Sequence, residues 1–153
     1  MKRYFQILFV ASLILAMSPL ATKAQCKGFA KKICKLELLP YIHDGNYHAA
    51  ILVEGEEAEL YKTFYSGQDY RIAVCGSDAF PDVEFRIVDQ NRNVLYDNKE
   101  NGLTRIWDFK LESSQQLKII VKVPVNEENT DEVVSGCVAI MFGFKEQPEG
   151  LKQ

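Results

Sequence analysis

The stretch Gly67–Asp89, GQDYRIAVCGSDAFPDVEFRIVD, decides how this chain folds. Apolar side chains alternate with polar or small ones in both halves, at Tyr70, Ile72 and Val74 and again at Val83, Phe85 and Ile87. Alternation with a period of two predicts strands with one buried side and one solvent-facing side. The turn-forming residues of Gly76–Pro81 separate the halves. The stretch therefore predicts two β-strands joined by a turn-rich loop.

The same pattern continues on both sides of this stretch. Further strands are expected at residues 47–53, 58–65, 94–96, 104–111, 115–123 and 136–144. Turn residues separate them, and no segment with a helical period follows Pro40. About eight short strands predict an all-β fold, an antiparallel β-sandwich of jelly-roll type, across residues 47–144.

The first 24 residues have the features of a secretory signal peptide. Lys2 and Arg3 precede the apolar run Phe5–Met17, and small residues at Thr22 and Ala24 fit a cleavage site. The apolar run is short for a membrane anchor, and a lipid-attachment site requires a small residue where Gln25 precedes Cys26. We therefore expect a signal peptide over 1–24, a single domain over 25–153, and a secreted or periplasmic protein without a transmembrane segment in the mature chain.

Residues 27–38 are expected to form a short N-terminal helix that Pro40 ends. Phe29, Ile33 and Leu36 have the spacing of an apolar helix face. Four lysines (27, 31, 32 and 35) lie mostly on the other side, where a solvated face is favoured over a site for an anionic partner.

Small apolar residues predict where this helix packs. Ala73 and Cys75 lie opposite the bulky side of their strand, and so do Cys137, Ala139 and Met141. A solvent-facing strand surface normally carries charged or hydroxyl side chains, so something should cover this one. The helix is the one spare apolar element, and we expect it outside the sandwich, near Cys75 and Cys137.

All four cysteines follow the expected cleavage site, and an even number in an exported chain predicts disulfides rather than a zinc site. The preferred pairing is Cys75 with Cys137, between neighbouring strands, and Cys26 with Cys34 as a local loop. The alternative ties the helix to the sheet through both bonds.

Residues 56–144 resemble bacterial pre-peptidase C-terminal domains. The resemblance rests on Leu60–Val74, on Asp82–Asp89 with Asn93–Tyr96, and on Ser135–Ile140. It implies a jelly-roll accessory module of a secreted protein, some members of which bind calcium or an extracellular polymer. This chain differs in standing alone, in its four cysteines and in its N-terminal helix, and no calcium-ligand motif carries over.

Charge and motifs narrow the functional classes. Residues 1–24 hold three of the 18 basic residues and none of the 21 acidic ones, so the exported chain carries a net charge of −6 and nucleic acid is not expected as a partner. No nucleophile motif or phosphate loop is present, so no enzyme activity and no cofactor are expected. His43 and His48 match no metal-site spacing.

Asp78 and Asp82 lie in loops at strand ends, where their carboxylate oxygens are candidate calcium ligands. The alternative, which is favoured, is that these aspartates only stabilise the turns. Tyr61, Tyr65 and Tyr96 are the candidate ligand-binding residues, because exposed rings can stack on sugars or on protein side chains.

The sequence thus predicts a non-catalytic exported binding module for a protein or a polysaccharide of the envelope or the extracellular space. The alternatives are a structural envelope component without a small ligand, and an unrecognised enzyme or inhibitor.

Overall fold

The computed structural model describes residues 21–125 and 133–146, so residues 1–20 of the predicted signal peptide 1–24 lie outside the described residues. Its elements are α2 (Ala21–Lys32), the 3-10 helix η1 (Cys34–Leu38), β1 (Ile42–His43), β2 (His48–Val53), β3 (Glu57–Phe64), β4 (Asp69–Gly76), β5 (Glu84–Val88), β6 (Val94–Asp97), the 3-10 helix η2 (Asn98–Asn101), β7 (Ile106–Lys110), β8 (Gln115–Lys122) and β9 (Ser135–Phe144). All eight predicted strands are present, and only the two-residue β1 was not expected.

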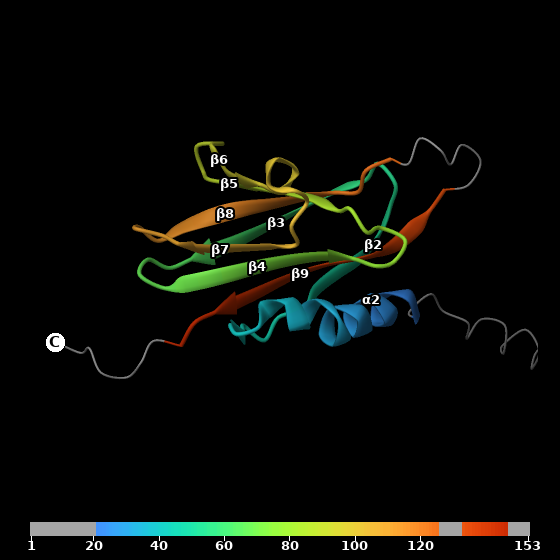
Figure 1. The fold of residues 1–153 in the computed structure, drawn as a ribbon, viewed down its shortest axis with the longest axis horizontal. Coiled ribbons are helices and arrows are strands. Elements are labelled where there is room, and N and C mark those ends of the chain that lie inside the picture. Colours follow the sequence, from blue (N-terminus) through green and yellow to red (C-terminus); the bar gives the residue numbers. More distant parts are fainter. Residues whose placement is uncertain (1–20, 126–132, 147–153) are drawn as a thin grey trace, which may run out of the picture.

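The strands form two antiparallel sheets packed face to face (Figure 1). Sheet A has the order β1/β2, β9, β4, β7, and sheet B has the order β3, β8, β5, β6. The pairs β5–β6, β4–β7, β3–β8 and β2–β9 are nested in the sequence and alternate between the sheets. This is the winding of a jelly roll, so the predicted fold class is confirmed.

The bulky side of each strand faces the space between the sheets. Sheet A contributes Ile72, Val74 and Phe142, and sheet B contributes Phe85 and Ile119, all with 2% exposure or less. These are the positions that period-two alternation marked as buried, because only that side of each strand can be removed from water inside a two-layer sandwich.

Helix α2 and η1 cover the outer side of sheet A, as expected (Figure 1). Here Ala30, Cys34 and Leu38 pack on the small residues of β4 and β9 in a second apolar cluster. The predicted buried face was wrong, however, because Ile33 and Leu36 are 51% and 62% exposed. The helix is turned so that residues four apart, from Cys26 through to Leu38, face the sheet instead.

The preferred disulfide pairing was also wrong. Cys26 is bonded to Cys137 and Cys34 to Cys75, so both bonds tie the helical segment to sheet A. Helix α2 runs on past Cys26, and at about 1.5 Å per residue this carries Cys34 out of its reach. In the β4–β9 register Cys75 lies opposite Ala139 rather than Cys137.

Arg71 of β4 holds the C-terminal end of η1 in place. Its Nη1 donates to the carbonyl oxygens of Leu39 and Glu37 at 2.6 and 3.2 Å. Its other nitrogens bind both carboxylate oxygens of Asp108 at 2.6 Å, which lowers the pKa of Asp108. The guanidinium also lies 4.6 Å from the Tyr41 ring. Arg71 therefore supplies partners for two carbonyls that a helix end leaves free.

Candidate functional site

The outer side of sheet B is the broad surface that α2 and η1 leave open, because these helices contact strands of sheet A (Figure 1). Alternation along the strands places polar and charged side chains on this side. We call it the open face and define it by Glu57, Glu59, Tyr61, Glu84, Arg86, Asp97, Lys118, Ile120 and Lys122. Strand pairing places these residues in cross-strand rows, such as Glu57, Lys122 and Glu84.

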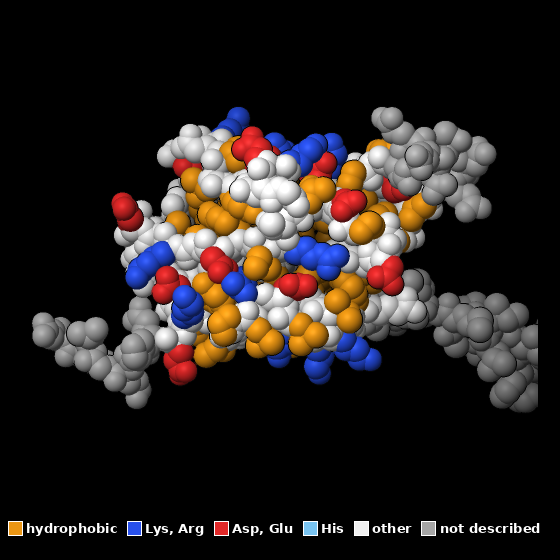
Figure 2. All heavy atoms as spheres, in the orientation of Figure 1, with side chains coloured by type: hydrophobic (Ala, Val, Ile, Leu, Met, Phe, Trp, Pro, Cys, Tyr) orange, Lys and Arg blue, Asp and Glu red, His pale blue; other side chains and the backbone are white. Residues whose placement is uncertain are grey.

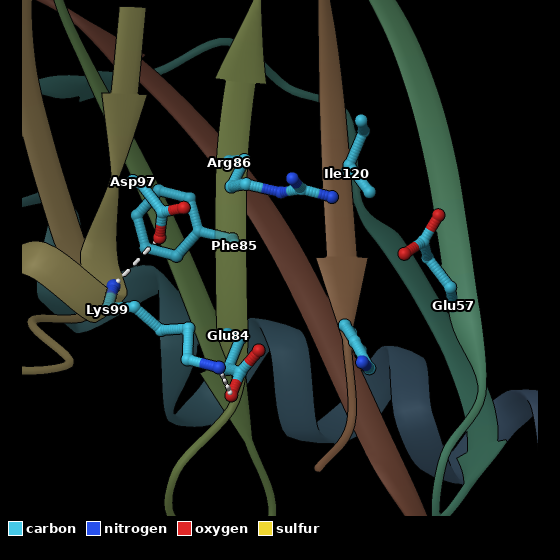
Figure 3. A pocket seen from close by; sticks show the side chains of 8 residues that line it. Glu57, Glu84, Phe85, Arg86, Asp97, Lys99 and Ile120 are labelled. Atoms are coloured by element: carbon cyan, nitrogen blue, oxygen red, sulfur yellow. Dashed lines mark hydrogen bonds and ion pairs between the residues drawn. The ribbon is translucent and has the colours of Figure 1, made fainter. Parts of the chain in front are cut away.

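A hollow of about 200 Å³ lies at one end of the open face, among β3, β8, β5 and β6 (Figure 3). Lys99 beyond β6 binds Glu84 at 2.9 Å. The Arg86 side chain extends over Ile120 towards Glu57 (Figure 3). Arg86 makes no ion pair within 4 Å in the described part of the chain. Its guanidinium therefore has donors to offer to a ligand.

A second hollow of about 530 Å³ adjoins the first, and Ile120 lines both. Its other lining residues include Tyr61, Val88 and Lys118. Tyr61 is 54% exposed, and the Lys118 ammonium lies 5.6 Å from its ring. The two hollows together form a shallow strip with an apolar floor and charged sides.

The charges beside Tyr61 are held by a three-residue network. Lys118 binds Glu59 at 2.9 Å, and the Tyr61 hydroxyl donates to the same carboxylate at 3.3 Å. The hydrogen bond from Lys118 lowers the pKa of Glu59, and the same bond raises the pKa of Lys118. Both groups therefore stay charged at neutral pH, which suits recognition better than proton transfer.

The three candidate tyrosines do not form one surface. Tyr61 lies on the open face, and Tyr65 is 66% exposed just after β3. Tyr96 points inward instead, stacks on Trp107 with ring centres 5.2 Å apart, and shares a hydrogen bond of 2.7 Å with Thr104. Tyr96 lies on β6, the edge strand of sheet B, and Trp107 lies on β7, the edge strand of sheet A, so the two rings pack together between the edges of the sheets.

The calcium candidates Asp78 and Asp82 lie exposed in the loop between β4 and β5. No group of three or more metal-ligating side chains occurs within residues 21–125 and 133–146. Two other loop aspartates stabilise turns through side-chain hydrogen bonds to main-chain amides. Asp89 accepts hydrogen bonds from the amides of Asn91 and Asn93, and Asp97 accepts one from the amide of Lys99.

The two histidines lie near the paired charges of Asp44 and Lys62, which are 2.7 Å apart. The His43 ring hydrogen-bonds the Asn46 carbonyl oxygen at 2.8 Å, and the His48 ring meets Phe142 edge to face at 5.5 Å. Burial raises the pKa of Asp44, but hydrogen bonds from Lys62 and Asn46 outweigh it, so the net shift is downward.

His48 should make the fold less stable in mild acid. Burial lowers its pKa, Lys62 and His43 add to this, and Asp44 opposes it. Because the folded pKa lies below the unfolded value of about 6.5, the contribution is complete above that pH and is lost as pH falls through the folded pKa. Urea unfolding of His48→Gln between about pH 8 and pH 5 should show a shallower loss than the wild type. A proton-NMR titration midpoint for His48 above 6.5 would contradict this expectation.

Sequence reasoning missed the residues that shape the open face. Alternation places Glu84, Arg86 and Lys118 on the solvent-facing sides of their strands, but the sequence does not show which strands are neighbours. The pairing of β5 with β8 and of β3 with β8 brings Arg86, Ile120 and Glu59 into one cross-strand row.

No protein-family model matches the chain, and no curated protein matches it in sequence. Solved structures with a similar fold include the following two. Aeromonas hydrophila PliG, a periplasmic lysozyme inhibitor of g-type lysozyme, aligns with a TM-score of 0.48 and 10% identity over 65% of this chain and 85% of that one. Salmonella Typhimurium PliG, a protein of the same description, aligns with a TM-score of 0.39 and 12% identity over 63% of this chain and 86% of that one. At these identities the likeness concerns the strand arrangement alone.

Both disulfides are typical of an exported protein. Among the helices of the described residues, none has the length and apolar character needed to cross a membrane. The resemblance to pre-peptidase C-terminal domains stays a prediction.

Proposed function

We propose that this chain is an exported, non-catalytic binding module that recognises a protein through the open face. The observation that carries the proposal is the uncovered strip over Ile120, with Tyr61 exposed beside it and with Arg86, which makes no ion pair among the described residues. Arginine and tyrosine are, with tryptophan, the residue types most enriched where interfaces concentrate their binding energy.

A protein partner fits the open face better than a polysaccharide. Within the four strands of sheet B, Tyr61 is the one exposed aromatic side chain, whereas a flat sugar-stacking surface usually needs several rings. Charges of both signs alternate across the strands, with Glu57 and Glu84 on either side of Lys122. Such a pattern favours a partner that presents complementary charges in a fixed order.

Surface capture with the disulfide-intact protein tests this proposal. The analytes are cell-envelope extract, a panel of polysaccharides and a purified g-type lysozyme, the target named for the two similar structures. We expect saturable capture of one protein, weakened at least about tenfold by Arg86→Glu, because a cationic donor in the interface is replaced by a shorter side chain of opposite charge. Tyr61→Ala should also weaken the capture, and it should do so further when it is combined with Arg86→Glu.

Lys110→Glu is the matched control, because it makes the same charge reversal at an exposed position on β7 of sheet A. Capture that survives both open-face changes would show that the ligand binds elsewhere. Saturable capture of a polysaccharide would overturn the choice of a protein ligand, and no capture at all would favour a structural role in the envelope.

A further inference from the structure

An exposed row of aliphatic side chains runs along the outer side of the helical segment. Ile33, Leu36 and Leu39 are 51%, 62% and 67% exposed. The amide of Leu36 donates to Ile33 at 3.0 Å, and that of Leu39 donates to Leu36 at 3.2 Å. In 3-10 geometry residues three apart lie above one another, so the three side chains line up. We call them the aliphatic row.

The helical segment cannot turn to bury the aliphatic row. Its inner side is bonded to sheet A by Cys26 and Cys34, and Leu38 is 1% exposed in the cluster beneath. Arg71 holds the far end through the carbonyls of Glu37 and Leu39. The row therefore faces solvent as a fixed feature of the fold, and exposed apolar groups of this kind mark interaction surfaces.

Four lysines lie on the same helical segment as the aliphatic row. Lys27, Lys31, Lys32 and Lys35 are all exposed, and none lies within 4 Å of a carboxylate in the described residues. Residues 25–42 carry a net charge of +3, whereas residues 43–153 carry −9. Hydrophobic and basic side chains appear together along the lower edge in Figure 2, where α2 and η1 lie in Figure 1. An acidic protein thus presents one side on which lysines and the aliphatic row occur together.

We propose that this side docks the protein on a membrane surface that contains anionic lipids. The lysines would contact the headgroups while the aliphatic row enters the boundary with the acyl chains. An anionic polymer would satisfy the lysines but leave the aliphatic row in water. A second copy of the chain would bring the lysines of both copies together, which the like charges disfavour.

Docking in this way agrees with the rest of the fold. The helical segment covers sheet A, and the open face belongs to sheet B on the other side of the sandwich (Figure 1). A protein bound to the membrane through α2 and η1 would hold the open face towards the solvent. The proposal does not depend on what the open face binds.

Vesicle flotation with the full disulfide-intact exported protein tests the proposal. The probes are phosphatidylcholine vesicles and mixed phosphatidylcholine–phosphatidylglycerol vesicles. We expect binding to the mixed vesicles, weakened by salt and by Lys31→Glu with Lys35→Glu, because screening and charge reversal remove the attraction to the headgroups. Leu36→Ser should weaken it about tenfold through the loss of buried apolar area.

Two matched controls sit outside the helical segment. Leu95→Ser makes the same exchange at an exposed leucine of β6, and Lys110→Glu reverses a charge on β7. Neither should alter flotation. Absence of binding to the mixed vesicles would overturn the proposal. Binding that Leu36→Ser leaves intact would also overturn it and would point to an anionic polymer, and a concentration-dependent dimer abolished by Leu36→Ser would point to a second copy.

Discussion

Replacing Cys26 and Cys137 together by alanine is expected to lower the free energy of unfolding by about 4 kcal/mol. The bond joins residues separated by 111 positions, so it removes much of the freedom of the unfolded chain. It also holds α2 on β9, and without it the N-terminal half of the helix loses its attachment while Cys34–Cys75 still holds η1. Urea unfolding measures the loss of stability, and amide hydrogen exchange should show faster exchange in residues 26–32 than in β4 or β9.

The matched control is the alanine pair at Cys34 and Cys75. It opens a shorter loop, with a separation of 41, and the expected loss is again close to 4 kcal/mol because loop entropy grows slowly with length. In that variant η1 rather than α2 should lose protection. A loss below about 1 kcal/mol for the Cys26–Cys137 pair would contradict the expectation. Peptide mapping without reduction that links Cys75 to Cys137 would contradict the pairing itself.

Asn98→Ala is expected to destabilise the protein by about 3 kcal/mol. Asn98 begins η2, is fully buried, and is the one buried polar side chain among the described residues. Its Oδ1 accepts a hydrogen bond of 2.8 Å from the Phe85 amide, and its Nδ2 donates to the Val83 carbonyl oxygen at 3.0 Å. Removing the side chain leaves an amide and a carbonyl of the main chain without partners away from water, which costs more than the bonds themselves contribute.

Asn101→Ala is the control for this prediction. Asn101 lies in the same short helix and its side chain donates to the Asp97 carbonyl oxygen at 2.7 Å, but it is exposed. Water can replace that bond, so the loss should stay below about 1 kcal/mol. Equal losses for the two variants in urea unfolding would show that the buried network around Asn98 contributes little.

Alternation along the chain was sufficient to place every long strand. Residues such as Ile72, Val74 and Phe85 were recognisable as core positions because a strand exposes its side chains alternately, and this depends only on local geometry. The small apolar residues Ala73, Cys75 and Ala139 likewise indicated that another element covers the outer side of sheet A. A strand surface that faces water normally carries charged or hydroxyl side chains, and these positions carry none.

Alternation and apolar spacing could not predict which side of the helical segment faces sheet A. Two apolar sets compete in residues 26–38, one with Phe29, Ile33 and Leu36 and one with Ala30 and Leu38. The larger side chains suggested the first set, whereas the disulfides to Cys137 and Cys75 select the second. Bonds between residues separated by 111 and 41 positions leave no trace in a local pattern.

The fold class, the strand positions and the presence of a covering helix could be predicted from the sequence, because these follow from side-chain periodicity within a few residues. The disulfide pairing, the exposure of the aliphatic row and the composition of the open face required the three-dimensional structure. Each of these depends on which residues of distant segments lie side by side: Cys26 on Cys137, Arg71 on Leu39, and Arg86 in one row with Ile120 and Glu59. The register of the paired strands and the packing of the helical segment on sheet A depend on the whole chain. They determine which of the many solvent-facing residues lie close enough to act together.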